Sequence, residues 1–539
     1  MADLAKDQSI RKLGNYERYS LARDTTGNPQ LITYIATYPS DTSLPSVESL
    51  QSRARELVQE YPLLRARVID GRTTSPKWGL LSDEDVETGV RELVTDVELV
   101  DFIGRTASRN ENSEDQIPST VSAATLEKVI SQELGNERPL RVTSDKFLWR
   151  IVRYRSRTSG TPAFLALTIN HVISDGKSGL ALFDALLKEK EVTQQPSTDT
   201  IPPAEKFPRA LETTIDCKPS YGFMLRVVWN ELVIPRLPNF IAKRVKQTAC
   251  WPGVPPQAGP PGQQVYRHLA LSLRALANLK AMGKRHQVDT LHPIFEIAAV
   301  VALWCTSAKS ERPSSLKVVH STPISIRDQA LSFPSISGNY VASLDADIYC
   351  SNNGEQSFWQ EAKKYAEWLR STEGGQQAVQ AMGMLVHIPD GQNKVDGESP
   401  APTGWETFLL NKASRAPSAS IEVSNLGHLP RLPPTATSVI FAQTKNIFGP
   451  PIIVNAIGHA AGTDFVVCWR KDAFALGKDQ EMEDFVRTFA AVLAFLAEQE
   501  PQDLSAEVET SLSFADLRKC GEPLVHCHSQ KLALEFAQC

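Results

Sequence analysis

The stretch that decides the fold is TPAFLALTINHVISDGKSGLALFDALLKE, residues 161–189. Its segment 163–170 is apolar and rich in strand-forming residues, which is typical of a buried strand. The last part places Leu180, Phe183 and Leu187 at helical spacing, which predicts an amphipathic helix. The sequence NHVISDG therefore falls at a strand-to-helix turn, where functional residues are often found.

This turn contains a histidine and an aspartate four residues apart, followed by a glycine. His171 can accept a proton near neutral pH, because an imidazole ordinarily titrates there. Asp175 can hold the turn by pairing with a cation or by capping the helix, and Gly176 permits a backbone that a side chain would hinder. The alternative for His171 is a core histidine bonded to backbone groups. Since an H-x-x-x-D-G element arises by chance in roughly a few per cent of such chains, it needs support from the rest of the sequence.

The rest of the chain predicts an α/β fold with two halves, each a mixed sheet flanked by helices. A segment rich in proline and glycine, 191–265, separates them as a crossover. We expect an N-terminal subdomain at 1–190, a C-terminal subdomain at 266–500 and a tail at 501–539. A polar stretch at 105–120 reads as a surface loop. The expected strands are 31–39, 63–70, 147–156, 265–273, 316–327 and 452–469, and the expected helices are 47–61, 272–282 and 291–304.

Composition excludes several classes of protein. The 539 residues carry a net charge of −5 with no long run of lysine or arginine, so nucleic acid is not an expected partner. The eight cysteines are scattered, which favours a reducing compartment, and the N-terminal residues lack the apolar core of a signal peptide. The longest apolar run is also far short of the ~20 residues that a membrane span needs. We therefore expect an intracellular, cytoplasmic protein.

Two further patterns predict no cofactor. The sequence Gly176-Lys177-Ser178 ends like a phosphate-binding loop, but His171 stands where that loop requires glycine. The cysteines and histidines at 520–528 do not have the spacing of a zinc site. Neither a bound nucleotide nor a metal is expected.

Several other segments support the turn through their order along the chain. With the HxxxDG element they resemble the fungal alcohol acetyltransferase family, within the superfamily of chloramphenicol acetyltransferase, the plant BAHD enzymes and condensation domains. The resemblance covers about residues 10–495. The segments are RKLGNYERYSLAR (11–23), YPLLRARV (61–68), TPISIRDQ (322–329), GNYVASLDADI (338–348), FWQEAKKYAEWL (358–369), SNLGHLP (424–430) and FAQTKNIFGPPIIVNAIGHAAGTDFVVCW (441–469).

The resemblance implies roles for named residues and a fold of two chloramphenicol-acetyltransferase-like subdomains with an active-site tunnel at their interface. His171 would be the general base. Asp175 would be mainly structural and paired with Arg327, and Ser424 and Asn425 would line the site or donate to an oxyanion. The alternatives remain open: Arg327 as a solvated turn residue, and Ser424 and Asn425 as residues that satisfy a turn.

The activity that the resemblance implies is transfer of an acyl group from acyl-CoA to a small, terpenoid or sterol-like alcohol in fungal secondary metabolism. The resemblance also implies a short acyl group such as acetyl. Peptide condensation is disfavoured because Asn170 stands where condensation domains usually carry a second histidine. The D-F-G-W-G element of the plant enzymes is also missing from the sequence. Transfer to an amine, or a catalytically silent protein that binds a hydrophobic ligand, are the alternatives. We expect a monomer.

Residues 221–246 of the crossover combine apolar and basic side chains. Such a segment fits either a helix packed over the tunnel or a peripheral helix lying on an anionic membrane. Packing is the favoured interpretation, because Pro235 and Pro238 limit the helix and the whole chain is acidic.

Overall fold

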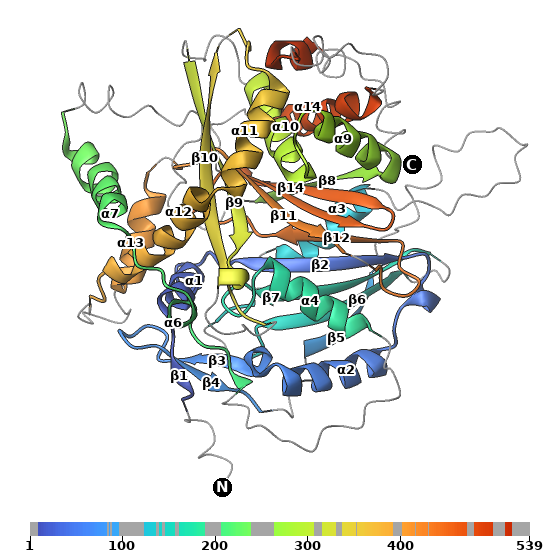
Figure 1. The fold of residues 1–539 in the computed structure, drawn as a ribbon. Coiled ribbons are helices and arrows are strands. Elements are labelled where there is room, and N and C mark those ends of the chain that lie inside the picture. The colour runs from blue at the N-terminus through green and yellow to red at the C-terminus, as the bar shows by residue number, and fades with distance from the viewer. Residues whose placement is uncertain are drawn as a thin grey trace, which may run out of the picture.

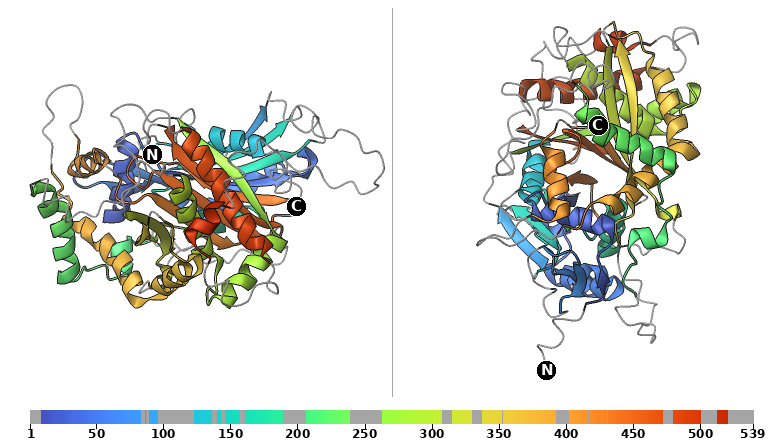
Figure 2. Two further views of the ribbon diagram at one scale, coloured as in Figure 1. Left: turned by 90° about the horizontal axis from the view of Figure 1, so that it is seen from above. Right: turned by 90° about the vertical axis from the view of Figure 1, so that its left-hand side faces the viewer.

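The computed structural model describes most of the chain (Figure 1). The described ranges are 9–95, 123–188, 206–238, 263–306, 315–329, 337–391, 402–471, 479–499 and 512–519, except for 83–85, 87–88, 136–139, 143–145, 157–160, 352, 416 and 430. The N-terminal elements form the lower half in the view of Figure 1 and most of the later ones form the upper half, an arrangement also visible in the right-hand view of Figure 2.

The first sheet carries the HxxxDG turn at the end of its central strand. Strand β7 is completely buried because both of its faces are covered, and it pairs antiparallel with β2 and β6. Strand β5 adds to β6 in parallel, so the sheet is mixed. Its order is β12 (Ser438–Gln443), β2 (Leu31–Tyr38), β7 (Ala163–Asn170), β6 (Trp149–Ser156) and β5 (Val90–Thr95).

The edge strand β12 comes from the far end of the chain. It pairs antiparallel with β2, with Ile440 opposite Ile35 and Gln443 opposite Ile32. Figure 1 shows this late segment beside β2, next to the N-terminal elements. The first sheet is therefore completed by the second half of the sequence.

The second sheet has six strands and is also mixed. Strands β9, β11 and β13 run parallel, and antiparallel pairs flank them on both sides. The order is β10 (Val341–Ser351), β9 (Ser315–Ser325), β11 (Ile421–His428), β13 (Ile452–His459), β14 (Gly462–Arg470) and β8 (Gln264–Ser272). A small third sheet consists of β1 (Arg11–Lys12), β4 (Lys77–Leu80) and β3 (Ala66–Ile69).

The helices cover these sheets and begin at residues suited to that position. Ser46, Asp175 and Ser272 each accept a backbone N–H from the first turn of the helix that they precede. The helices are α1 (Asn15–Thr25), α2 (Val47–Glu60), α3 (Ala123–Leu134), α4 (Gly176–Leu187), α6 (Leu211–Thr214), α7 (Tyr221–Val228), α9 (Leu273–Arg285), α10 (Leu291–Thr306), α11 (Phe358–Arg370), α12 (Thr372–Gly383), α13 (Gly404–Ala413) and α14 (Asp479–Glu498).

Three apolar clusters hold the fold together. One packs α2 and α4 against the first sheet, and a second packs α9, α10, α11 and α14 against the second sheet. The third joins the halves: Ile130 of α3, Phe164 of β7, Ile440 of β12 and Val466 of β14 all belong to it. Since this cluster contains residues of both halves, the two halves share one continuous interior. Burial of apolar surface is the main stabilising contribution to folding.

The architecture confirms the predicted fold class of mixed sheets flanked by helices. The expected strand at 452–469 is a hairpin of two strands, because the chain reverses at Ala460–Ala461 before Gly462, whose φ is +152°. The predicted loop at 105–120 lies outside the described residues. The subdomain bounds 1–190, 191–265 and 266–500 stay a prediction. Of the tail 501–539, the described part packs on the second half, where Phe514 and Leu517 are buried.

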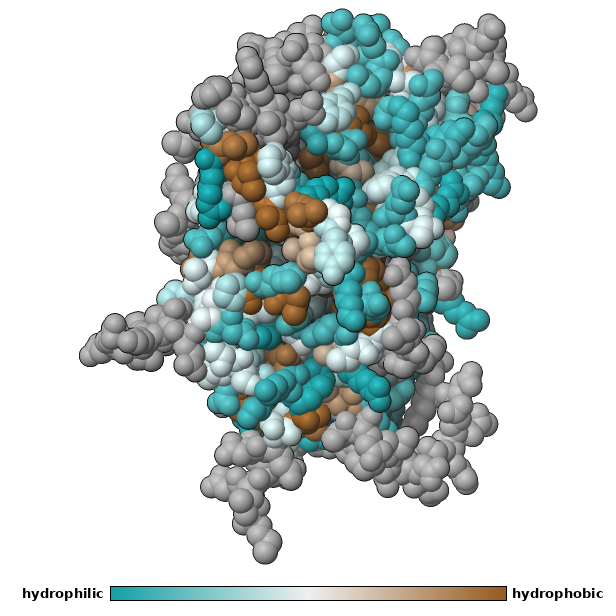
Figure 3. All heavy atoms as spheres, turned by 60° about the vertical axis from the view of Figure 1, so that its left-hand side comes forward, coloured by the Kyte–Doolittle hydropathy of each residue, from teal (hydrophilic) through white to brown (hydrophobic). Residues whose placement is uncertain are grey.

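The favoured interpretation of the segment 221–246, a helix packed over a tunnel, is wrong for its first part. Helix α7 has no buried residue, and Tyr221, Leu225, Val228 and Trp229 are exposed. Figure 3 turns this side of the molecule forward and shows apolar side chains on the surface among polar ones. None of the described helices combines the length and apolarity that a membrane span needs.

Candidate active site

The histidine of the turn is held by backbone contacts and is buried. The His171 N–H donates to the Gln30 carbonyl at 2.8 Å, which fixes the chain as it leaves β7. Burial, together with the nearby positive charge of Arg23, lowers the pKa of His171 to about 4. The imidazole is consequently neutral at physiological pH, which is the form that can accept a proton.

Asn339, just before β10, contacts the histidine from the other half of the protein. Its side-chain nitrogen lies 2.9 Å from His171 Nδ1 and 2.8 Å from the His171 carbonyl oxygen. Within the described chain, Nε2 makes no hydrogen bond, and His171 lines a cavity. No local pattern in the sequence marks Asn339, because its partner is 168 residues away.

Asp175 binds groups from both halves. One carboxylate oxygen accepts the Ser178 N–H at 2.8 Å, which makes Asp175 the N-cap of α4. The other accepts the Tyr340 N–H at 2.7 Å and pairs with Arg327 Nη1 at 2.7 Å. The structure thus places Arg327 against Asp175, and the N-cap role and the ion pair coexist. This carboxylate joins the motif turn to the start of β10.

Two glycines permit this close packing. A Cβ on Gly176 would lie 2.6 Å from Leu426 Cδ2, so a side chain there would force the Leu426 side chain to move. Gly338, with φ of +135°, accepts the Asp175 N–H at 3.1 Å and donates to Ser178 Oγ at 3.0 Å. Any other residue at 338 would be strained in this conformation. Small residues therefore allow the two halves to meet at the motif.

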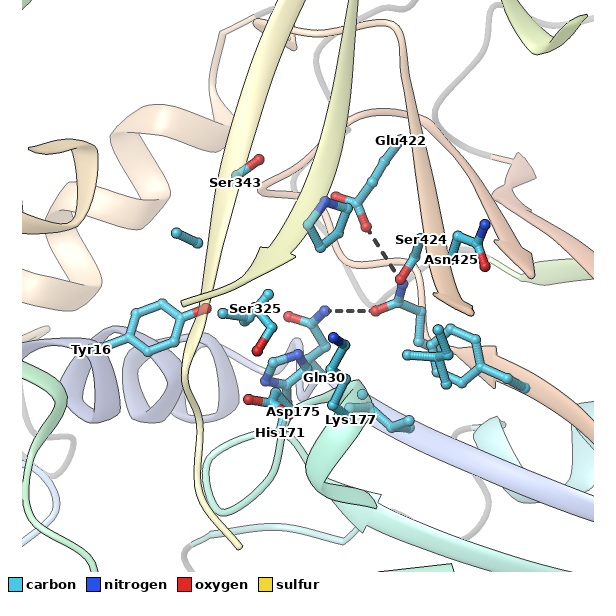
Figure 4. Close-up of a pocket in the computed structure, with 18 of the residues that line it drawn as sticks. Tyr16, Gln30, His171, Asp175, Lys177, Ser325, Ser343, Glu422, Ser424 and Asn425 are labelled. Carbon is cyan, nitrogen blue, oxygen red and sulfur yellow. Dashed lines mark hydrogen bonds between the residues drawn. The ribbon is translucent and has the colours of Figure 1, made fainter. Parts of the chain in front are cut away.

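A single cavity brings the predicted site residues together (Figure 4). Helix α4 and the turn before it form one wall, and β9, β10 and β11 from the second half form another. All six residues singled out from the sequence line the cavity: His171, Asp175, Gly176, Arg327, Ser424 and Asn425.

Ser424 and Asn425 differ in what they present to the cavity. Figure 4 shows Ser424 across the cavity from His171, whereas the Asn425 amide points away from it. Asn425 Oδ1 accepts the Gly427 N–H at 2.8 Å, and Gly427 has φ of +81°. Asn425 therefore satisfies a turn, as the alternative interpretation of this residue held. Of the two residues, Ser424 is the better placed to contact a molecule in the cavity.

A polar chain of side chains that the sequence did not indicate forms the inner wall. Arg23 donates to Gln30, whose amide donates to Gln443 at 3.1 Å; Gln443 in turn donates to Glu422 at 3.4 Å. Burial raises the pKa of the Glu422 carboxyl. These residues come from α1, β12 and β11 and from the position just before β2, so only the tertiary fold reveals the group.

Asn170 has a structural explanation in this turn. Its amide nitrogen donates to Asp24 Oδ2 at 2.9 Å and to the Leu140 carbonyl at 2.7 Å, and its oxygen accepts the Val172 N–H at 2.9 Å. All of its hydrogen-bonding groups are therefore engaged in holding the turn. This position therefore carries an asparagine that anchors the loop and not a second histidine.

Comparison with known proteins identifies the family of the chain. A sequence profile described as alcohol acetyltransferase matches residues 12–493. The chain belongs to the alcohol acetyltransferase family. This family membership makes it an acyltransferase enzyme. No curated protein sequence is significantly similar to the chain.

Solved structures show the same fold at low sequence identity. The trichothecene 15-O-acetyltransferase TRI3 from Fusarium sporotrichioides is 11% identical with a TM-score of 0.58, over 90% of this chain and 94% of that one. The condensation domain of the monacolin K polyketide synthase MokA is 11% identical with a TM-score of 0.52, over 94% and 99% of the two chains. This member of the alcohol acetyltransferase family therefore has the two-subdomain fold that the resemblance implied.

The described residues contain no group of three or more His, Cys, Asp or Glu side chains arranged to hold a metal ion. The cysteines and histidines at 520–528 lie outside the described residues.

Proposed function

We propose that this protein transfers an acyl group, acetyl in the first instance, from acyl-CoA to the hydroxyl of an alcohol. The observation that carries the proposal is His171, a neutral imidazole whose Nε2 is unbonded among the described residues and which lines the cavity between the halves. A neutral base at the wall of a cavity is suited to activating a hydroxyl.

The reaction needs one base and no covalent enzyme intermediate. His171 Nε2 removes the hydroxyl proton as the alcohol oxygen attacks the thioester carbonyl carbon. The tetrahedral oxyanion collapses, the carbon–sulfur bond breaks, and the coenzyme A thiolate takes the proton from the imidazolium. Binding both substrates in one cavity supplies proximity, and the base contributes roughly 10²–10⁴ in rate.

Asn339 contacts the ring on the side away from Nε2. With the ring proton on Nδ1, Nε2 is free to accept the hydroxyl proton. The Nδ1 side of the ring is held at the His171 backbone carbonyl, which hydrogen-bonds the ring and accepts from Asn339 Nδ2 at 2.8 Å. Asn339 is accordingly a positioning residue, acting through His171.

The oxyanion requires a donor on the opposite side of the reacting carbon. The Ser424 hydroxyl, buried on β11 across from His171, is the group that we assign to this role. Asn425 is assigned to the turn, because its oxygen is engaged with Gly427. Asp175 and Arg327 hold the wall of the cavity and take no part in proton transfer.

The subdomains 1–190 and 266–500, joined by the crossover 191–265, would form the two walls of the reaction tunnel. The acyl-CoA and the alcohol would then enter by different mouths and meet at His171. TRI3, whose fold this chain shares, is a trichothecene 15-O-acetyltransferase, which supports an alcohol acceptor.

The experiment is mass spectrometry of the purified full-length protein with acetyl-CoA and a panel of small, terpenoid and sterol alcohols, with amines of matched skeleton. We expect an acetylated alcohol and one free coenzyme A per product. Products from amines alone would show N-transfer. Retention of a hydrophobic compound without any acetylation or coenzyme A release would identify a silent binding protein and overturn the proposal.

A further inference from the structure

The strongest unexplained surface is the exposed side of helix α7. We define the α7 face as Tyr221, Leu225, Val228 and Trp229, whose side chains are 84%, 70%, 41% and 49% exposed. The helical spacing of 221, 225, 228 and 229 places them on one side of a single helix. Large apolar side chains gathered at this exposure usually mark an interaction site.

The helix is anchored at one end, so its apolar face is a fixed feature. Ser220 caps α7 by accepting the Phe223 N–H at 3.3 Å. The Ser220 hydroxyl also donates to Gln380 of α12 at 2.9 Å, and its backbone N–H donates to the same oxygen at 3.0 Å. Gly383 passes so close to the Cys217 carbonyl that a Cβ there would clash at 1.7 Å. The chain leading into α7 is thereby tied to α12 while the helix itself stays on the surface.

We propose that the α7 face binds the surface of an anionic phospholipid membrane. Tyr221 and Trp229 stand at its two ends, and both are side chains with an apolar body and a polar tip, which favour the headgroup region of a bilayer. Lys218, Arg226 and Arg236 are exposed in the same stretch of chain, with Asp216 as the exposed anion, so cations outnumber anions among the described exposed residues around this face.

A second copy of the chain is a poorer occupant. Four partly exposed side chains offer on the order of 500 Å² in total, from the ~150–250 Å² that a large side chain presents. A stable dimer buries about 800 Å² on each partner. Insertion into a lipid interface needs no such matching surface, because a short apolar helix face with neighbouring cations is sufficient.

The test is flotation of the full chain with vesicles of phosphatidylcholine and phosphatidylserine in a 7:3 ratio, and with phosphatidylcholine alone. We expect wild type to float with the mixed vesicles. The double variant Leu225→Glu with Trp229→Glu should bind at least tenfold more weakly, because it puts two charges into the apolar face. Arg226→Glu with Arg236→Glu should weaken binding to the anionic vesicles by about fivefold for each cation lost and leave any binding to pure phosphatidylcholine unchanged.

A matched control uses exposed apolar residues elsewhere. Leu273 and Tyr349 are 54% and 46% exposed in the second half of the chain. Leu273→Glu with Tyr349→Glu should float like wild type. Because all these side chains are exposed, the melting temperature of each variant should match that of wild type. Wild type that stays at the bottom of the gradient overturns the proposal. The proposal is also overturned if light scattering shows that wild type is a dimer and that the Leu225→Glu, Trp229→Glu variant is a monomer.

Discussion

Two buried histidines, one in each half, lie beside carboxylates but differ in what their rings contact. His320 of β9 bonds Glu296 directly through Nδ1 at 2.9 Å, and both side chains are almost fully buried inside the second half. His171 bonds no carboxylate; its nearby Asp175 binds Arg327 and backbone groups instead, and its ring borders a cavity. A histidine paired with a carboxylate in a sealed core stabilises the fold. Chemistry needs a nitrogen that a substrate can reach.

The largest expected difference between the two histidines is in turnover. His171→Ala should leave a folded protein and lower kcat/KM for acyl transfer at least 100-fold, since the proton acceptor is lost. His320→Gln should destabilise the protein by about 2 kcal/mol, because Glu296 loses the His320 ring and keeps its hydrogen bond from Thr322, with little change in turnover per folded molecule. Steady-state kinetics and thermal unfolding of both variants make the measurement. Equal turnover in wild type and His171→Ala would refute the assignment of the base.

The carboxylate of the turn should behave as a structural group, as Glu296 does. Asp175→Asn should destabilise the protein by about 2 kcal/mol, because Arg327 keeps its charge but loses its partner in a largely buried place. The check is a double-mutant cycle with Arg327→Met, read out by unfolding and by kcat. We expect the double variant to be less destabilised than the sum of the two single ones by about 1 kcal/mol. Strict additivity would show that the ion pair does not couple the halves.

The smallest effect concerns proton affinity. Activity requires neutral His171, so it should fall as pH drops through the pKa of about 4. Asn339→Asp places a negative charge against the ring, which favours the imidazolium and should move this acid limb upward by roughly one to three pH units. The pH profile of kcat/KM measures it, with Asn339→Ala as the uncharged control, which should lose activity without the upward movement. A profile for Asn339→Asp that coincides with that of Asn339→Ala would contradict the positioning role.

The same burial has a consequence for stability. The pKa of His171 is about 4 in the folded protein but near 6.5 when unfolded, so between these values the unfolded chain binds the extra proton. The stability associated with neutral His171 is therefore complete above about pH 6.5 and decreases as the pH falls toward 4. Activity assays on the acid side need a parallel measurement of unfolding.

The parts of the site that lie close together in sequence could be predicted from it. Strand β7, the turn and α4 were predictable because apolar spacing, a cap and a glycine all occur within one short stretch. The partner of Asp175 followed only from the family resemblance, since nothing local distinguishes Arg327 from a solvated arginine. Asn339 and Gln443 carried no signal, because each acquires its role from a partner far along the chain.

The sequence was least informative about edges and surfaces. Strand β12 is only six residues long, and although a turn at Pro433–Ala436 precedes it, its place is set by pairing with β2. Helix α7 has the composition of a packed helix, and only its position shows that its apolar side faces outward. Local periodicity predicts that an element exists, whereas its neighbours are decided by long-range packing.

The position of β12 late in the sequence means that the site cannot be complete until most of the chain has been synthesised. Strand β2 ends at Tyr38, but the strand that covers its edge begins at Ser438. At a synthesis rate of roughly 5–20 residues per second, the edge of β2 stays unpaired for on the order of 20 to 80 seconds before β12 is made. Phe441 and Gln443 of β12 line the cavity of His171, so the nascent chain has no complete cavity until then. An uncovered strand edge over that interval is a place where partly made chains can associate with one another, which makes translation speed a determinant of yield.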